Sequence, residues 1–192
     1  MSKISVFTQR GHPVMGIGAE FLRNPCSVSV KNDGRLIVCD SGDRSIKLLS
    51  PDGTKLLKSF RANEDDASPW FALHAQEKYF VSYRTGQSVK VFNEDGVYLH
   101  DIGEFDAPAG LAIDKFSNLI ACDSDAKSVQ VLTLKGKFIT SLPAGKYLEC
   151  PCSVVVTNDG DVLIADVTSG LILKFHHHDS GYQFHEKRYL IS

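Results

Sequence analysis

GRLIVCDSGDRSIKLLSPDG, residues 34–53, has two close counterparts elsewhere in the same chain. They are SNLIACDSDAKSVQVLTLKG at 117–136 and GDVLIADVTSGLILKF at 160–175. Each copy contains an apolar run that ends in an aspartate and is followed by a second apolar run. A catalytic motif usually occurs only once in a chain, whereas a repeat fold contains several copies of one structural unit. The sequence therefore predicts a fold that is built by repetition.

Prolines and aspartates at a fixed spacing define the repeating unit. In three of four units, an aspartate follows the first proline by 15 residues, as in Pro25 and Asp40, Pro108 and Asp123, and Pro151 and Asp166. The remaining unit begins at Pro69 and has Ser82 only 13 residues later. This second unit is therefore shorter and degenerate.

The runs inside a unit are typical of β-strands, because they are short, rich in β-branched residues and bounded by turn residues. In the first unit they are SVSV at 27–30, LIVCD at 36–40, SIKLL at 45–49 and KLLKSF at 55–60. Turn sequences such as Asn32-Asp33-Gly34 separate them. Four short antiparallel strands in each unit of about 40 to 45 residues are typical of a β-propeller blade. We predict an all-β propeller as a single domain over 1–192, with blades at about 16–60, 61–104, 105–144 and 145–192 and a spare strand at 3–7.

The unit resembles the NHL repeat in the pattern P-x-S-V-x-V-x-x-D-G-x-L-I-V-x-D-S, and the resemblance covers about residues 16–176. It is similar to the NHL propellers of tripartite-motif and related RING-type E3 ubiquitin ligases. Six blades are usual in that family, and four units are recognisable here. We expect either a part of a larger propeller, which we favour, or a ring that closes with unusually few blades.

The composition is that of an ordinary globular protein, with 21 Lys and Arg against 23 Asp and Glu. This balance provides no general attraction to nucleic acid or to an anionic membrane. The N-terminal sequence lacks the apolar core of a signal peptide, and the five cysteines are odd in number. We therefore expect reduced thiols and a cytoplasmic location. Cys39 and Cys122 are expected to be small buried strand residues.

The candidate binding residues lie on the loops that join blades and on those that join the second and third strands, because such loops vary without disturbing the sheets. They are Arg23, Arg44, Trp70, Phe71, Tyr83, Arg84 and Lys127. Trp70 stands where other units have Cys26, Ala109 or Cys152, so its indole is a candidate anchor for a peptide or a base. The alternative is that Trp70 fills space in the degenerate blade.

Two groups suggest metal chemistry but favour a structural explanation. Asp40, Asp123 and Asp166 recur at one position of the blade, where an aspartate accepts hydrogen bonds from its own loop. His176 and His178 would share one face of a strand, but no nearby cysteine completes a metal site, and Asp179 and His185 are only loosely suggestive of one. We expect no cofactor, no metal and no catalytic residue.

Three functions remain open. The first is a non-enzymatic module that binds a protein or peptide, and the NHL resemblance implies substrate recognition in a ubiquitin-ligase-like protein. The second is an RNA-binding propeller for single-stranded or hairpin RNA in post-transcriptional regulation. There Arg23, Arg44, Arg84 and Lys127 would contact phosphates. The third is an NHL-like lyase or hydrolase. We expect no membrane partner, and the sequence leaves the oligomeric state open.

Overall fold

The computed structural model describes residues 2–62, 67–143, 147–178 and 181–190, and for 177, 178, 181 and 183–190 it describes the backbone alone. Every regular element longer than one residue in these ranges is a β-strand. Within the described ranges, no helix is long and apolar enough to cross a membrane.

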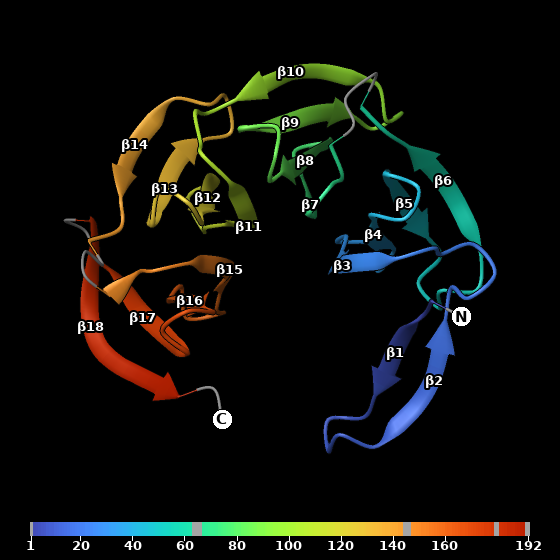
Figure 1. The fold of residues 1–192 in the computed structure, drawn as a ribbon, viewed down its shortest axis with the longest axis horizontal. Helices are drawn as coiled ribbons and strands as arrows, with labels where there is room; N and C mark the ends of the chain where they lie inside the picture. The colour runs from blue at the N-terminus through green and yellow to red at the C-terminus, as the bar shows by residue number, and fades with distance from the viewer. Residues whose placement is uncertain (1, 63–66, 144–146, 179–180, 191–192) are drawn as a thin grey trace. The chain divides into compact units, whose positions relative to one another are not determined.

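Four antiparallel sheets of four strands each account for most of the chain (Figure 1). The first sheet contains β3 (Pro25–Val30), β4 (Leu36–Asp40), β5 (Ser45–Leu49) and β6 (Leu56–Phe60). The second contains β7 (Phe71–Ala75), β8 (Lys78–Tyr83), β9 (Ser88–Asn93) and β10 (Tyr98–Ile102). The third contains β11 (Pro108–Ile113), β12 (Asn118–Asp123), β13 (Ser128–Thr133) and β14 (Phe138–Ser141). The fourth contains β15 (Pro151–Val156), β16 (Val162–Asp166), β17 (Leu171–His178) and β18 (Gly181–Leu190). The predicted all-β fold of four-stranded propeller blades is confirmed.

The register confirms that the repeats are equivalent in space. Pro25 lies opposite Asp40 across β3 and β4, and the same proline and aspartate face each other in the third and fourth sheets. A bulge follows the proline each time, and it contains Cys26, Ala109 or Cys152. The spacing read from the sequence therefore corresponds to one structural position in each of these three sheets.

The second blade is shorter because its first turn is tighter. β7 and β8 are joined by Gln76 and Glu77 alone, with φ angles of 46° and 58°. Positive φ at both central residues is typical of the two-residue hairpin turn that matches the twist of its strands. The first blade instead has a longer turn that ends at Gly34, with φ of 84°. The two missing residues in the second unit are therefore accounted for by the turn.

The predicted spare strand is one half of a hairpin. β1 (Ile4–Phe7) pairs with β2 (Pro13–Ile17), and Ile4 lies opposite Ile17. The sequence analysis missed β2, because a segment that starts with proline and contains Gly16 has little intrinsic strand character. Pairing with β1 is what makes this segment a strand.

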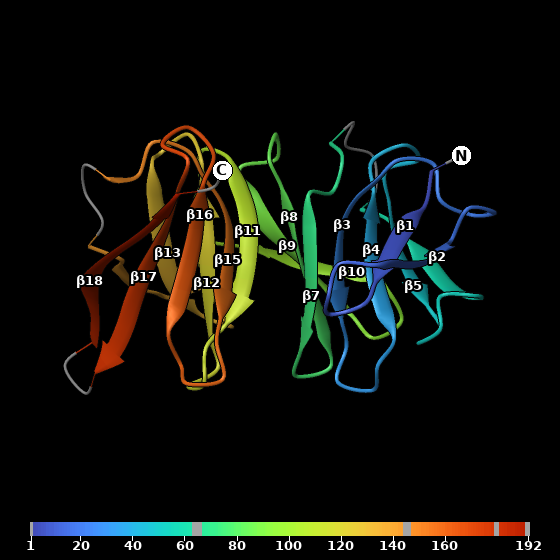
Figure 2. The same cartoon turned by 90° about the horizontal axis from the view of Figure 1, so that it is seen from below.

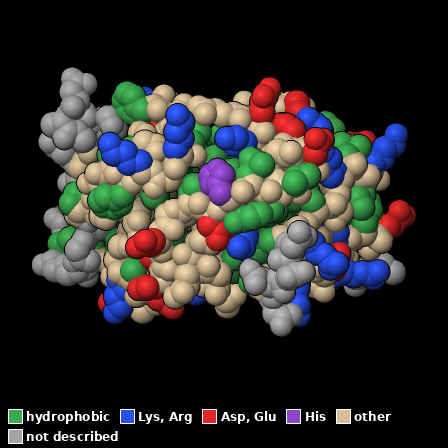
Figure 3. All heavy atoms as spheres, turned by 90° about the horizontal axis from the view of Figure 1, so that it is seen from above, with side chains coloured by type: hydrophobic (Ala, Val, Ile, Leu, Met, Phe, Trp, Pro, Cys, Tyr) green, Lys and Arg blue, Asp and Glu red, His purple; other side chains and the backbone are tan. Residues whose placement is uncertain are grey.

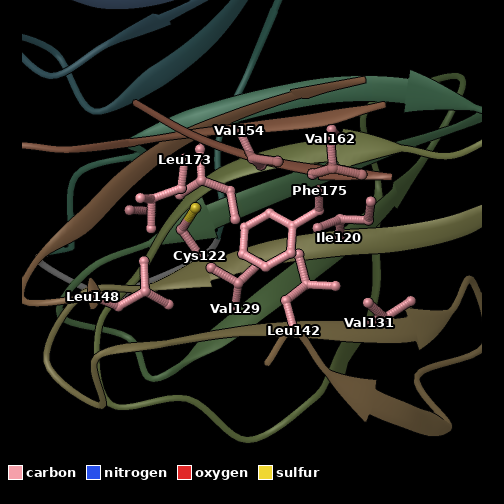
Figure 4. Packing of buried hydrophobic residues seen from close by; sticks show 13 residues of the cluster. Ile120, Cys122, Val129, Val131, Leu142, Leu148, Val154, Val162, Leu173 and Phe175 are labelled. Atoms are coloured by element: carbon pink, nitrogen blue, oxygen red, sulfur yellow. The ribbon is translucent and has the colours of Figure 1, made fainter. Parts of the chain in front are cut away.

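The chain forms two compact units. Unit 1 comprises residues 1–81 and 90–100, and unit 2 comprises residues 82–89 and 101–192. In unit 2, Phe175 lies in the middle of a core that combines the third and fourth sheets (Figure 4). In unit 1, Tyr79 is fully buried and its ring packs 5.0 Å from that of Phe60. Cys39 and Cys122 are fully buried, as predicted.

In each unit, the turns between the first and second strands of the blades lie at one end, and the segments that lead into the blades lie at the other. In unit 1, the β3–β4 and β7–β8 turns lie at the same end (Figure 2). In unit 2, the β11–β12 and β15–β16 turns likewise share one end. The segments that lead into a blade lie at the opposite end, beside the loop that joins its second and third strands. We call this opposite end the loop end of the unit.

Candidate functional site

A buried aspartate organises the loop end of the first blade. Asp40 ends β4, and its side chain accepts hydrogen bonds from the backbone N–H groups of Arg23 and Asn24, both at 2.7 Å. It also accepts one from the N–H of Gly42 at 3.1 Å. One carboxylate therefore joins the segment that leads into the blade to the loop that follows β4. Such bonds fix loop backbone that would otherwise be free to move.

The two equivalent aspartates act in the same way. Asp123 accepts from the N–H groups of Asp106, Ala107 and Ala126. Asp166 accepts from those of Glu149, Cys150, Thr168 and Ser169. The structural interpretation of these carboxylates is confirmed. Besides the predicted hydrogen bonds from their own loops, they also accept hydrogen bonds from the segments that lead into the blades. Together, Asp40, Asp123 and Asp166 are the strand-end aspartates.

The surroundings of the strand-end aspartates differ at one equivalent position, seven residues later. In the first blade this residue is Lys47, whose Nζ lies 2.7 Å from Asp40 and 2.5 Å from Asp43, and both Lys47 and Asp40 are buried. In the third blade it is Gln130, and in the fourth it is Leu173, a member of the core in Figure 4. The position seven residues after a strand-end aspartate thus holds a lysine that pairs with it, an amide side chain or an apolar side chain.

Asp40 and Asp166 make the fold sensitive to acid. Burial raises the pKa of Asp40 and Asp166, but hydrogen bonds outweigh burial, with the Lys47 ammonium foremost at Asp40, and hold both pKa values below the usual range. A carboxyl with a lowered folded pKa stabilises the fold fully above its unfolded pKa of about 3.9. This stabilisation is lost as the pH falls through the folded value.

We therefore expect the urea midpoint to be insensitive to these two groups between about pH 5 and 7 and to fall below about pH 4. Urea unfolding followed by circular dichroism at several pH values measures this. The double variant Asp40→Asn, Asp166→Asn should show a weaker dependence. An unchanged wild-type midpoint at about pH 3 would contradict the expectation.

The predicted binding residues of unit 1 gather at its loop end. Arg23 donates its backbone N–H to Asp40, and Arg44 belongs to the loop after β4. Trp70 leads into β7, and its carbonyl lies 3.6 Å from the Cys26 sulfur beside the start of β3. Phe71 is half-buried, whereas Trp70 is 37% exposed. We define the unit 1 rim as Arg23, Asn24, Ser41, Arg44 and Trp70.

The other three predicted residues belong to unit 2, and one of them is not on the surface. Tyr83 ends β8 and is only 1% exposed, so the prediction that it lies on an exposed loop is wrong. Every residue of β8 from Tyr79 to Tyr83 is buried, because this strand lies between β7 and β9 and is covered on both faces, which the local sequence does not reveal. Arg84 is half-buried and Lys127 is exposed. Tyr83 is therefore unavailable for stacking in this structure.

Three of the loops between second and third strands hold a polar side chain in a strained backbone conformation. Arg44, Gln87 and Lys127 have φ of 58°, 53° and 52°, where the fourth blade has Gly170 at 66°. A residue other than glycine costs about 1 kcal/mol in this left-handed region. The long polar side chains are thus kept at a cost in conformational energy, which is common where side chains serve recognition.

Sequence reasoning missed a pocket at the loop end of unit 2. The pocket has a volume of about 430 Å³, and its walls are Gln87, Glu104, Phe105, Asp106, Asp123, Ala126 and Gln130. A second hollow of about 460 Å³ shares Glu104 and Gln130 with it and is completed by Gly103, Leu132, Gly136 and Phe138. The two hollows together are the unit 2 groove. The signal for it in the sequence is the change from Lys47 to Gln130 at one repeat position.

The histidine cluster provides no metal site in the part of the chain that the structure describes. His176 contacts Asp161 through Nδ1, and Asp161 also pairs with Lys174 at 2.6 Å. The side chains of His177, His178 and His185 lie outside the described residues. Among the described residues, no group of three His, Cys, Asp or Glu side chains is placed to hold a metal ion.

The five cysteines are free thiols in the structure. Burial raises the pKa of Cys26, Cys39, Cys122 and Cys152. A raised pKa lowers the fraction of thiolate, the reactive form. Cys39 and Cys122 therefore pack as small apolar side chains, whereas Cys26 is exposed and Cys152 is half-buried.

Known structures resemble the chain as a whole. A streptogramin B lyase superposes with a TM-score of 0.76 at 17% identity, over 98% of this chain and 62% of the lyase. The fold is that of a β-propeller. A nidogen/laminin complex matches with a TM-score of 0.78 at 16% identity, over 98% of this chain and 72% of the matched chain. The WD40 propeller domain of Doa1 matches with a TM-score of 0.69 at 17% identity, over 93% of this chain and 58% of the matched chain. A scan against protein families and a search of curated proteins found no match.

These likenesses establish the propeller fold alone. The neighbours include a lyase, a WD40 propeller domain and a nidogen/laminin complex, and one fold hosts many functions. The chain spans less than two thirds of the lyase. The function must therefore be argued from the site.

Proposed function

We propose that the chain is a non-enzymatic interaction module that binds a protein or peptide at the unit 1 rim, with Trp70 as the anchor. The observation that supports this proposal most is the exposure of Trp70. At the equivalent position of unit 2, Ala109 is fully buried and Cys152 is half-buried. A large indole thus stands at a position where a small residue suffices for the fold. Tryptophan and arginine are enriched among residues that dominate binding energy.

The surroundings of Trp70 supply a rigid frame. Ser41 donates its backbone N–H to the carbonyl of Asn24 at 3.0 Å. The carboxylate of Asp40 accepts hydrogen bonds from the backbone of both segments, at Asn24 and at Gly42. The Cys26 thiol contacts the carbonyl of Pro69 at 3.3 Å. A preorganised surface loses little conformational entropy when a ligand binds. The unit 1 rim therefore has an aromatic anchor and arginine neighbours on a fixed backbone.

The resemblance to NHL repeats favours a particular role within this proposal. The chain would recognise substrates for a ubiquitin-ligase-like protein in the cytoplasm, with ligase chemistry carried by other domains. Propellers seen in the nidogen/laminin complex and in Doa1 are consistent with protein partners. The enzymatic alternative has the streptogramin B lyase as its fold neighbour, at 17% identity.

RNA is the competing ligand, because Arg23 and Arg44 share the rim with Trp70. Two observations weaken it. Tyr83 is buried, and Arg84 and Lys127 belong to the other compact unit. On the face drawn in Figure 3, Lys and Arg side chains are interspersed with Asp and Glu. RNA binding by phosphate contacts typically needs a continuous basic surface.

Trp70→Ala is expected to weaken peptide binding by about 30-fold or more, the usual effect of removing an aromatic anchor. Peptides selected from a random phage-displayed library against the purified chain serve as ligands. Because Trp70 is the only tryptophan, its fluorescence should change on binding and report the rim directly. Affinity should vary less than about threefold between 0.1 and 0.5 M salt.

Phe116→Ala is the matched control, because Phe116 is a 54% exposed aromatic in a turn of unit 2. It should leave the affinity unchanged. Equal affinities for the wild type and Trp70→Ala would refute the anchor. Binding of a single-stranded RNA oligonucleotide whose affinity falls about one logarithmic unit per phosphate contact would favour the RNA function instead.

A further inference from the structure

We infer that the unit 2 groove binds an extended protein segment that places a Lys or Arg side chain beside Asp123 and an apolar side chain against Phe138. This inference is independent of the proposed function, because it concerns other residues in the other compact unit. It follows from a comparison of equivalent positions inside the chain.

The strand-end aspartate has a lysine counterion in the first blade but has glutamine at the same position in the third. Asp40 is fully buried and has a buried ammonium from Lys47 at 2.7 Å. Asp123 occupies the equivalent position and is 1% exposed, but Gln130 replaces the lysine. Across the described ranges of the chain, Asp123 has no Lys, Arg or His within ion-pair distance. A buried carboxylate without a counterion favours the approach of a cation.

Space for that cation exists in the pocket. Asp123 and Gln130 both line it. The Gln130 amide donates to the carbonyl of Glu104 at 3.1 Å, so it does not fill the place of the Lys47 ammonium. In the first blade, the buried ammonium of Lys47, a residue of the same sheet, lies beside the aspartate. In the third, a side chain from outside can enter.

The other charges of the pocket add to this preference. Glu104 and Asp106 are exposed on its wall, and none of the described residues that line it is Lys or Arg. Both oxygens of Asp123 already accept backbone N–H groups, which disfavours direct coordination of a metal ion. A guanidinium or ammonium keeps these bonds and adds its own donors. The chemical complement of the pocket is therefore an organic cation.

The rest of the groove fits an extended apolar segment. Gln130 and Leu132 lie two residues apart on β13 and thus face the same side. Phe138 lies opposite Leu132 on β14 and is 54% exposed. The groove therefore runs along the strand, from a charged end at Asp123 to an apolar end at Phe138. A peptide in extended conformation matches this direction.

The first test uses Nα-acetyl-arginine amide as the probe, with Nα-acetyl-citrulline amide as its uncharged isostere. Two-dimensional NMR of the labelled chain follows the side-chain amide of Gln130 and the backbone amides of Asp106 and Ala126. We expect shifts at these groups with the arginine probe and none with the citrulline probe. Equal shifts with both probes, or shifts confined to other residues, would overturn the inference.

Gln130→Lys supplies the counterion from inside, as Lys47 does. We expect it to abolish the shifts caused by the arginine probe. It should also weaken, by at least about tenfold, binding of hexapeptides selected on the wild type for a basic residue near an aromatic or aliphatic one. Phe138→Ala should weaken the hexapeptides but leave the arginine probe unaffected. This difference separates the two ends of the groove.

Thr168→Lys is the charge-matched control, because Thr168 is exposed on the equivalent loop of the fourth blade, outside the groove. It should bind as the wild type does. A loss equal to that of Gln130→Lys would show that overall charge is responsible and would overturn the inference. If Gln130→Lys does not fold, the double variant Glu104→Gln, Asp106→Asn replaces it. Unchanged binding of the arginine probe and the hexapeptides by that double variant would also overturn the inference. Trp70→Ala should bind the arginine probe normally, which separates this groove from the unit 1 rim.

Discussion

Asp40→Ala is expected to lower the free energy of unfolding by about 3–5 kcal/mol, the usual effect of removing one partner of a buried ion pair. Lys47 is 3% exposed along its side chain and would keep a buried charge, with Asp43 as its remaining acidic partner among the described residues. The N–H groups of Arg23 and Asn24 would lose their acceptor as well. Urea unfolding followed by Trp70 fluorescence measures the effect in unit 1.

The repeat offers a matched control for this prediction. Asp123→Ala removes the same kind of acceptor from backbone N–H groups but leaves no buried lysine, so we expect a loss of about 1–3 kcal/mol. The double variant Asp40→Ala, Lys47→Met should recover part of the stability lost in Asp40→Ala, since no buried charge remains. If Asp123→Ala is as destabilising as Asp40→Ala, the backbone bonds and not the ion pair dominate.

Phe175→Ala should lower the free energy of unfolding by about 3–5 kcal/mol as well, because it leaves a cavity in the core of unit 2. Phe175 is fully buried, and Figure 4 shows its ring surrounded by Ile120, Val129 and Leu142. Ile120 and Val129 belong to the third sheet and Leu142 directly follows its last strand, whereas Phe175 belongs to the fourth sheet, so this one side chain joins both sheets. Circular dichroism during urea unfolding measures the loss.

Phe138→Ala is the control for Phe175→Ala, since it removes the same side chain from a 54% exposed position. A change within about 0.5 kcal/mol is expected there. A similarly small change in Phe175→Ala would mean that the third and fourth sheets do not share the packed core described above. The comparison of fluorescence with circular dichroism also shows whether units 1 and 2 unfold together.

The position of Lys47, Gln130 and Leu173 illustrates how a repeat protein varies its surface. The backbone hydrogen bonds of the strand-end aspartates are preserved in all three blades, whereas the residue seven positions later changes. The result is an ion pair in the first blade, a pocket in the third and a packed core in the fourth. Divergence at one position of a conserved frame therefore produces local chemistry without a change of fold.

The sequence alone determined the blades, most of their strands, the structural role of the strand-end aspartates and the burial of Cys39 and Cys122. These features depend on local patterns. Strand alternation, turn residues and a fixed spacing between proline and aspartate are all properties of short segments. The hydrogen bond that Asp40 accepts from Gly42 in its own loop is of the predicted kind, whereas those from residues 16 and 17 positions earlier go beyond the prediction.

The tertiary structure decided what depends on distant segments. β2 is a strand because β1 pairs with it, and Tyr83 is buried because both faces of β8 are covered by other parts of the chain. The predicted binding residues divide between two compact units, and the unit 2 groove combines residues from 87 to 138. The burial of a side chain and the space beside it are set by packing with residues far away in sequence, and no local pattern contains that information.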